Sequence, residues 1–311
     1  FNEALESYKQ AVEIDPKNGV AYYNLGALYL EKKDIDKAHE YLEMSVGLDE
    51  AYYEAHEALS RVYSKKKMYD KAVFEINEAI KLRNDEPSLH LSLGSLLLKS
   101  DKENQAEKVF IKTADLFPKS FTVQLRIAEW YFTRENFDKA FNFYKVAEKL
   151  SSNSHVVQSR LGKIYTIKND NVKAQKAFEK LIKIRPNDAQ SYYQFGKLLS
   201  SEGKLSRAQS LLSNAISLDS TYGPSHHELG IVLLGRGEVD SAKEEFQKAL
   251  NIDPENSDFT ASMLRDLESG YRTEHEHIIG SLLRRGKQAK LDCPSLQLAY
   301  TQMMIRELKE S

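Results

Sequence analysis

Apolar residues return along the chain at helical spacing and in a fixed register of 34 residues. The segment AYYNLGALYL, which begins at residue 21, aligns with segments that begin at residues 55, 89, 123, 157, 191 and 225. An alanine recurs in the same register, at residues 4, 38, 72, 106, 140, 174, 208 and 242. Self-similarity at a period of this length is the signature of a repeat protein. The pattern therefore predicts a series of equal repeats with no insertion between them.

Each period predicts a pair of helices. With Gly19 as position 1, residues at positions 4, 7, 8 and 11 share one face of a first helix, and those at positions 20, 24 and 27 share one face of a second. Small side chains at positions 8 and 20 allow two helix backbones to approach closely. Position 8 never holds a residue larger than serine: Gly26, Ser60, Gly94, Ala128, Gly162, Gly196 and Gly230.

Helix ends are predicted in the same register. Proline at position 32 ends the preceding helix at Pro16, Pro118, Pro186 and Pro254. Two residues later stand the candidate N-caps Asn18, Ser120, Ser154, Asp188 and Asn256. Gly203 and Gly237 at position 15 predict the turn inside a pair.

This combination of Leu-Gly, Tyr, Ala, Phe or Tyr, and Pro resembles the tetratricopeptide repeat family over about residues 1 to 256. The tryptophan common at position 4 of the family is absent, and Trp130 at position 10 favours a structural role. The resemblance implies an all-α, right-handed α-solenoid of stacked helix-turn-helix repeats, with the first helices on the concave side. Because a unit of this size is below the roughly 40 residues that can build a core alone, each repeat must bury its faces against its neighbours.

We expect four parts in the chain. Residues 1–18 form the second helix of an incomplete first repeat, 19–256 form seven repeats, 257–270 form a capping helix, and 271–311 form a C-terminal helical extension. The extension either closes the solenoid or docks a partner through its Met-rich face.

The first helix lacks the helix that would normally precede it, so Phe1, Leu5, Tyr8 and Val12 are predicted to face nothing. Either the given chain starts after residues that the full protein contains, or an exposed end face docks a partner or a second copy. In the isolated chain we expect self-association or fraying at this end.

Composition narrows the partner class. Lys and Arg total 44 against 46 Asp and Glu, so no global field attracts nucleic acid or an anionic membrane. No stretch approaches the roughly 20 apolar residues of a membrane span. We expect a soluble protein with no membrane insertion in the given chain, the cytoplasm being the favoured compartment, and a protein or peptide as its partner.

Enzyme chemistry has no support in the sequence. No phosphate-binding glycine loop, no zinc-protease motif and no nucleophile motif occurs, and the single cysteine, Cys293, rules out a cysteine-based zinc cluster. His275 and His277 are two residues apart, which does not place them on one helix face. We therefore predict no catalytic residue, no metal and no cofactor.

The family resemblance implies that positions 2, 5, 6, 9, 12 and 13 of the first helices line a ligand groove. Neither the carboxylate clamp for chaperone tails nor an asparagine ladder at position 6 is present. Two rows of cationic residues are present instead. Position 6 holds Arg126 and Arg160, and position 9 holds Lys163 and Lys197, with Tyr193 beside them. We expect these five residues to bind an extended acidic segment or a chain-terminal carboxylate; the alternative is a solvated face partly neutralised by Glu129.

These expectations favour a non-enzymatic scaffold for protein–protein interaction that binds a peptide or protein segment in its groove. Two alternatives stay open: a substrate-recruiting or regulatory module of a larger enzyme, and a structural subunit of a multiprotein assembly.

Overall fold

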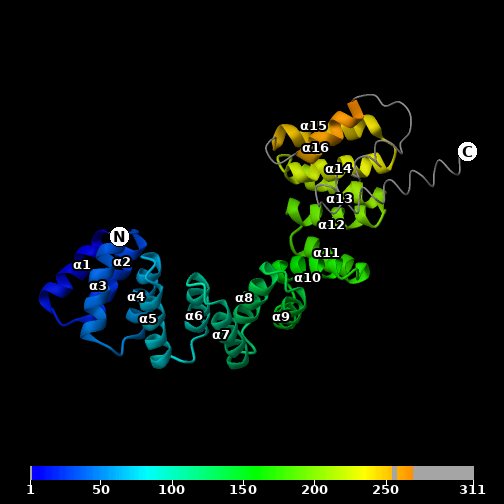
Figure 1. Ribbon diagram of the computed structural model, residues 1–311. Helices are drawn as coiled ribbons and strands as arrows, with labels where there is room; N and C mark the ends of the chain where they lie inside the picture. The colour runs from blue at the N-terminus through cyan, green and yellow to red at the C-terminus, as the bar shows by residue number, and fades with distance from the viewer. Residues whose placement is uncertain (1, 254–257, 269–311) are drawn as a thin grey trace, which may run out of the picture. The chain divides into compact units, whose positions relative to one another are not determined.

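The computed structural model describes residues 2–253 and 258–268, and within these ranges all regular structure is helical (Figure 1). The chain begins with α1 (Asn2–Ile14), and the last described helix is α16 (Asp258–Glu268). Between them lie seven pairs of helices. The first helices are α2 (Gly19–Glu31), α4 (Tyr53–Lys65), α6 (Pro87–Lys99), α8 (Phe121–Thr133), α10 (His155–Ile167), α12 (Ala189–Ser201) and α14 (Gly223–Gly235). The second helices are α3 (Ile35–Leu48), α5 (Tyr69–Leu82), α7 (Glu103–Leu116), α9 (Phe137–Leu150), α11 (Asn171–Ile184), α13 (Leu205–Leu218) and α15 (Val239–Ile252).

The pairs keep one interval throughout. First helices start 34 residues apart and have 13 residues each, and second helices start at the same interval and have 14 residues each. The predicted all-α solenoid fold of stacked helical pairs is confirmed. Two compact units divide the chain, residues 1–150 with α1 to α9 and residues 151–311 with α10 to α16, and each unit is described by itself below.

The small residues at positions 8 and 20 close each helical pair. The alanines at position 20 from Ala38 to Ala242 are fully buried. A Cβ atom added to Gly26 would lie 2.5 Å from Leu42, and one added to Gly94 would lie 2.3 Å from Phe110. Because both partners hold position 24 of their repeats, the predicted close approach of the two helices is confirmed.

Local signals also behave as expected at the helix ends. Asn18, Ser120, Ser154 and Asp188 each accept a hydrogen bond from the backbone N–H three residues later, whereas Asn256 lies outside the described residues. The turn at position 15 has positive φ at Gly203 and Gly237 and also at five residues with side chains: Lys33, Lys67, Asp101, Glu135 and Asn169. Packing of the pair fixes this turn even where the sequence offers no glycine.

The prediction of an uncovered N-terminal face was wrong for Leu5. Its side chain is 8% exposed and packs into a core with Leu25 and Tyr29 of α2, and Tyr8 and Val12 lie partly buried against the same core. The reason is the position of Leu5 in the repeat. It directly follows the alanine at position 20, and its side chain packs against α2, the first helix of the following pair. Phe1 lies outside the described residues.

At the other end, α16 packs Met263, Leu264 and Leu267 into the core of the second unit. The helical extension expected over 271–311, including Cys293, His275 and His277, lies outside the described residues.

Candidate protein-binding surface

The five residues predicted to bind a ligand lie in two different units. Arg126 is an exposed residue of α8 in the first unit. The other four belong to the second unit, Arg160 and Lys163 on α10 and Tyr193 and Lys197 on α12. Of the five, Tyr193 and Lys197 are in contact, with the lysine Nζ 5.9 Å from the centre of the tyrosine ring. That all five form one surface stays a prediction.

The first-helix face, meaning positions 5, 6, 9, 12 and 13 of the first helices, is largely closed at α14. Glu228, Ile231 and Leu234 hold positions 6, 9 and 12 there and are at most 6% exposed. On the neighbouring helix, the Tyr193 ring packs edge-on against Tyr222 with ring centres 5.3 Å apart. Burial, followed by the charge of Glu228, raises the pKa of Tyr193, so its hydroxyl stays neutral.

A half-buried histidine continues this closed region. The Nδ1 atom of His227 lies 2.7 Å from the Thr260 hydroxyl of α16. Burial, with a smaller contribution from the positive charge of Lys197, lowers the pKa of His227 to about 4, so its ring is neutral at physiological pH. This part of the second unit therefore holds apolar side chains, a neutral histidine and the carboxylate of Glu228 beside its cations.

The first unit is open on the same face. A hollow of about 1070 Å³ extends over α4, α6 and α8. Arg126 is among the residues that line it, and most of the others were not singled out from the sequence. We call it the α4–α8 hollow. The charged residues that line it are Glu57, Arg61, Lys65, Glu86, Lys99, Arg126 and Glu129. One signal could have indicated it: Lys65 and Lys99 hold position 13 of consecutive repeats.

The cations of the α4–α8 hollow are available to a ligand. Arg61, Lys65 and Arg126 are exposed and form no ion pair with a carboxylate in the described part of the chain. Lys99 Nζ donates only to the Ser64 hydroxyl, at 3.3 Å. These side chains can therefore pair with an anionic partner without first breaking an internal ion pair.

Two carboxylates of the α4–α8 hollow accept hydrogen bonds, and the pKa of a third is raised. Glu129 accepts a hydrogen bond from the Tyr144 hydroxyl at 2.6 Å, and Glu86 caps α6 by accepting from the backbone N–H of Ser88. Burial raises the pKa of Glu57, although nearby Arg61 opposes that shift. The hollow thus favours negative charge in its ligand.

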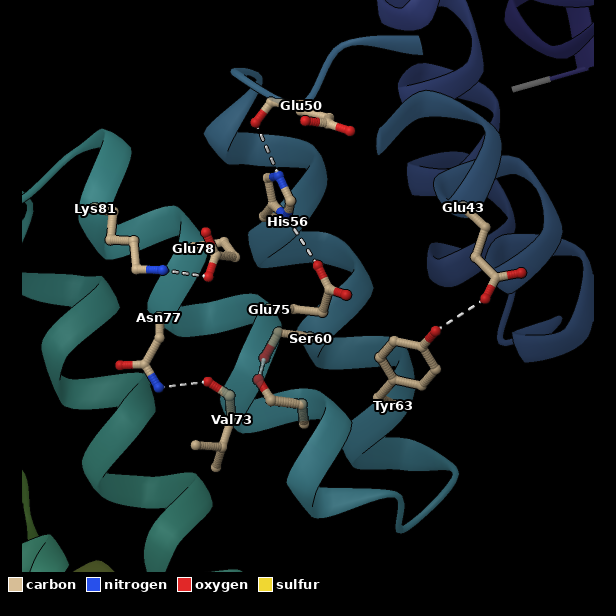
Figure 2. Close-up of polar contacts among 11 residues, drawn as sticks. Glu43, Glu50, His56, Ser60, Tyr63, Val73, Glu75, Asn77, Glu78 and Lys81 are labelled. Atoms are coloured by element: carbon tan, nitrogen blue, oxygen red, sulfur yellow. Dashed lines mark hydrogen bonds and ion pairs between the residues drawn. The ribbon is translucent and has the colours of Figure 1, made fainter. Parts of the chain in front are cut away.

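A buried histidine–glutamate pair joins the two helices of the repeat that forms one end of this hollow (Figure 2). His56 Nδ1 lies 2.7 Å from Glu75 Oε2, and Nε2 lies 3.1 Å from the Glu50 carbonyl oxygen. A carboxylate and a carbonyl only accept hydrogen bonds, so this geometry favours a ring that is protonated on both nitrogens. The hydrogen bond that His56 donates to the Glu75 carboxylate raises the pKa of His56.

The same position shows which part of this arrangement repeats. His226 lies 2.6 Å from Glu245 and 3.2 Å from the Ser220 carbonyl. His90 keeps the contact with the upstream carbonyl, at 3.0 Å from Asn84, but Val109 stands where the glutamate would be. The sequence analysis did not single out the glutamate at position 23, held by Glu75 and Glu245.

No cluster of three or more potential metal-ligating side chains occurs in the residues that the structure describes. Nor is any helix in those ranges long and apolar enough to cross a membrane.

Tetratricopeptide repeat models match several segments of the chain: residues 1–33, 20–52, 53–86, 157–188 and 177–210. A model of the ketopantoate reductase PanE/ApbA C-terminal domain matches residues 225–307. That range contains most of α14 and all of α15, which keep the 34-residue interval of the preceding pairs. Repeat geometry therefore accounts for the described pair in that match.

Relatives among curated proteins share a limited segment. A BBSome complex member BBS4 homolog of Drosophila melanogaster is 30% identical over 103 residues, 33% of this chain and 21% of that protein. Anaphase-promoting complex subunit 3 of Schizosaccharomyces pombe is 28% identical over 103 residues, 33% of this chain and 16% of that protein. The mitochondrial import receptor subunit TOM70 of Rattus norvegicus is 29% identical over 87 residues, 28% of this chain and 14% of that protein. The matches thus span about a fifth or less of these relatives.

Solved structures share the fold. The C-terminal part of a TPR repeat-containing protein from Cytophaga hutchinsonii superposes with a TM-score of 0.65 at 15% identity, covering 81% of this chain and 100% of that one. The APC/C hetero-tetramer Cut9-Hcn1 gives a TM-score of 0.51 at 16% identity, covering 85% of this chain and 52% of that one. These structures share the fold alone; the matches to tetratricopeptide repeat models, together with the helical pairs and their small residues at positions 8 and 20, show that the chain is a tetratricopeptide repeat protein.

Proposed function

We propose that this protein is a non-enzymatic scaffold that binds an acidic, extended segment of a protein partner on its first-helix face. The observation that supports this most is the α4–α8 hollow, in which Arg61, Lys65 and Arg126 have no carboxylate partner among the described residues. Carboxylates pair with arginine through two parallel hydrogen bonds, which gives such a surface both affinity and orientation.

The second unit adds cations to the same proposal. Arg160, Lys163 and Lys197 stand on α10 and α12, with Tyr193 beside Lys197. Because α14 is closed by apolar side chains and the carboxylate of Glu228, we infer that this unit contributes less to the binding of an acidic ligand than the α4–α8 hollow does.

The size of the hollow sets the length of the segment. Packed helices lie about 8–10 Å apart, so three first helices span about 20 Å. About seven residues of extended chain cover that length, and alternate side chains of an extended chain point the same way. A suitable probe is therefore a peptide of about seven residues that alternates glutamate and serine, blocked at both ends.

The test is a fluorescence anisotropy titration with this labelled probe. We expect saturable binding that weakens as salt rises, because screening acts beyond about 10 Å at 0.1 M salt. A peptide with glutamine in place of glutamate is the control. Equal binding of the two peptides, or binding that ignores salt, would contradict the proposal.

A second candidate role is a structural subunit of a larger assembly. It is favoured by the relatives, whose names place them in the BBSome complex and the anaphase-promoting complex. The two roles are compatible, since an acidic segment of a neighbouring subunit could be the ligand.

A further inference from the structure

A buried hydrogen-bond donor in the lining of the α4–α8 hollow has no partner. Trp130 of α8 is 8% exposed, and its indole Nε1 is closed to water and makes no hydrogen bond to any described residue. The same side chain lines the hollow next to Phe110, with ring centres 5.1 Å apart. Nearly all buried donors in folded proteins are paired, so an orphan donor beside an open hollow points to a missing acceptor.

We propose that Trp130 is a ligand-binding residue, and that its indole N–H donates to an acceptor oxygen of the acidic segment whose carboxylates pair with Arg61 and Arg126. This inference rests on the proposed function, and it names one further contact at the same site. The sequence favoured a structural role for Trp130, which its burial against Phe110 supports for the ring. The nitrogen is a separate matter, because packing does not satisfy a donor.

The acceptor must reach a nitrogen that is covered in the free chain. Arg134 lies over the indole ring with its guanidinium carbon 4.9 Å from the ring centre, and its side chain is exposed. The Arg134 guanidinium also pairs with the exposed carboxylate of Glu103. Because exposed ion pairs contribute little, this side chain can still move aside at little cost when a ligand arrives. Binding then relieves the cost of the unpaired donor, so the contact contributes to affinity although it contributes nothing to the free fold.

This reasoning predicts an effect on binding that is separate from the effect on stability. Trp130→Phe keeps an aromatic ring in the core and removes the N–H group. The smaller ring leaves a cavity that should lower the melting temperature somewhat, whereas loss of the unsatisfied N–H should not destabilise the free chain. The affinity of the variant for the glutamate–serine probe should fall about threefold to tenfold, the value of one hydrogen bond.

The experiment titrates the labelled probe into the parent, Trp130→Phe and the double variant Arg61→Glu, Arg126→Glu, with thermal melting of each by circular dichroism. In the parent, a second readout is available, because Trp130 is the only tryptophan of the chain and its fluorescence should change on binding.

The outcomes separate the two proposals. If Trp130→Phe binds like the parent while the arginine double variant binds weakly, the inference about Trp130 is wrong and the proposed function stands. If neither variant loses affinity, or the parent does not bind the probe, both are wrong.

Discussion

The first and second units use the same helical pair and differ on their first-helix faces. In the first unit, positions 9 and 6 of α4 and α8 hold Arg61 and Arg126, which stand exposed around an open hollow. In the second unit, positions 6 and 9 of α14 hold Glu228 and Ile231, which are buried. Positions 8 and 20 are alike in both units. The repeat frame therefore fixes the fold, while a few positions of the first helices decide whether a unit offers a binding surface.

The largest expected effect concerns how the end of the α4–α8 hollow is held together. His56→Ala removes one partner of a buried ion pair and leaves Glu75, which is 9% exposed, without its imidazolium. We expect a loss of about 3 kcal/mol in the free energy of unfolding, measured by urea denaturation. His90→Ala is the matched control, since His90 has no glutamate partner, and it should cost about 1 kcal/mol.

The same pair predicts a direction for the pH dependence. The pKa of His56 is raised in the folded chain. Its contribution to the free energy of unfolding is therefore complete below about pH 6.5, the ordinary pKa of histidine, and is lost as pH rises through the raised value. The parent and His90→Ala should both lose this contribution to stability as pH rises above about 6.5. A His56→Ala variant that shows the same loss would contradict the assignment.

A smaller effect should separate the cores of the two units. An added Cβ at Gly230 would lie 2.5 Å from Phe246, which is fully buried, so Gly230→Ala should cost about 2 kcal/mol through overpacking. The equivalent Gly94→Ala would push Phe110, whose ring lines the α4–α8 hollow, and we expect the ring to shift toward the hollow. We expect a cost of about 1 kcal/mol there, by the same denaturation measurement. Equal costs would mean that the hollow does not relax around Phe110.

Much of the fold could be predicted from the sequence because packing at positions 8, 20 and 24 leaves a repeat little choice. The turn at position 15 was predicted only from Gly203 and Gly237. Lys33 and Glu135 have the same positive φ without a glycine, because packing of the helical pair imposes it. The exposure predicted for Leu5 was wrong because its burial depends on α2, the helix that follows it, and not on a helix that would precede it.

The candidate site was harder to predict, because whether a side chain can bind a ligand depends on its tertiary contacts. Arg126 was singled out by its row of charges, yet the engagement of Glu129 by Tyr144 and the contact of Tyr193 with Tyr222 follow from packing. The orphan donor of Trp130 likewise has no sequence signal.

The most direct test of the account compares charge reversal in the two units. Arg61→Glu with Arg126→Glu alters the α4–α8 hollow, and Lys163→Glu with Lys197→Glu alters the second unit by the same charge. Titrated with the glutamate–serine probe, the first double variant should bind about tenfold more weakly than the parent and the second about threefold more weakly, with helical content unchanged in both. A larger loss from the second-unit variant, or no loss from either, would contradict the claim that the first unit holds the main binding surface.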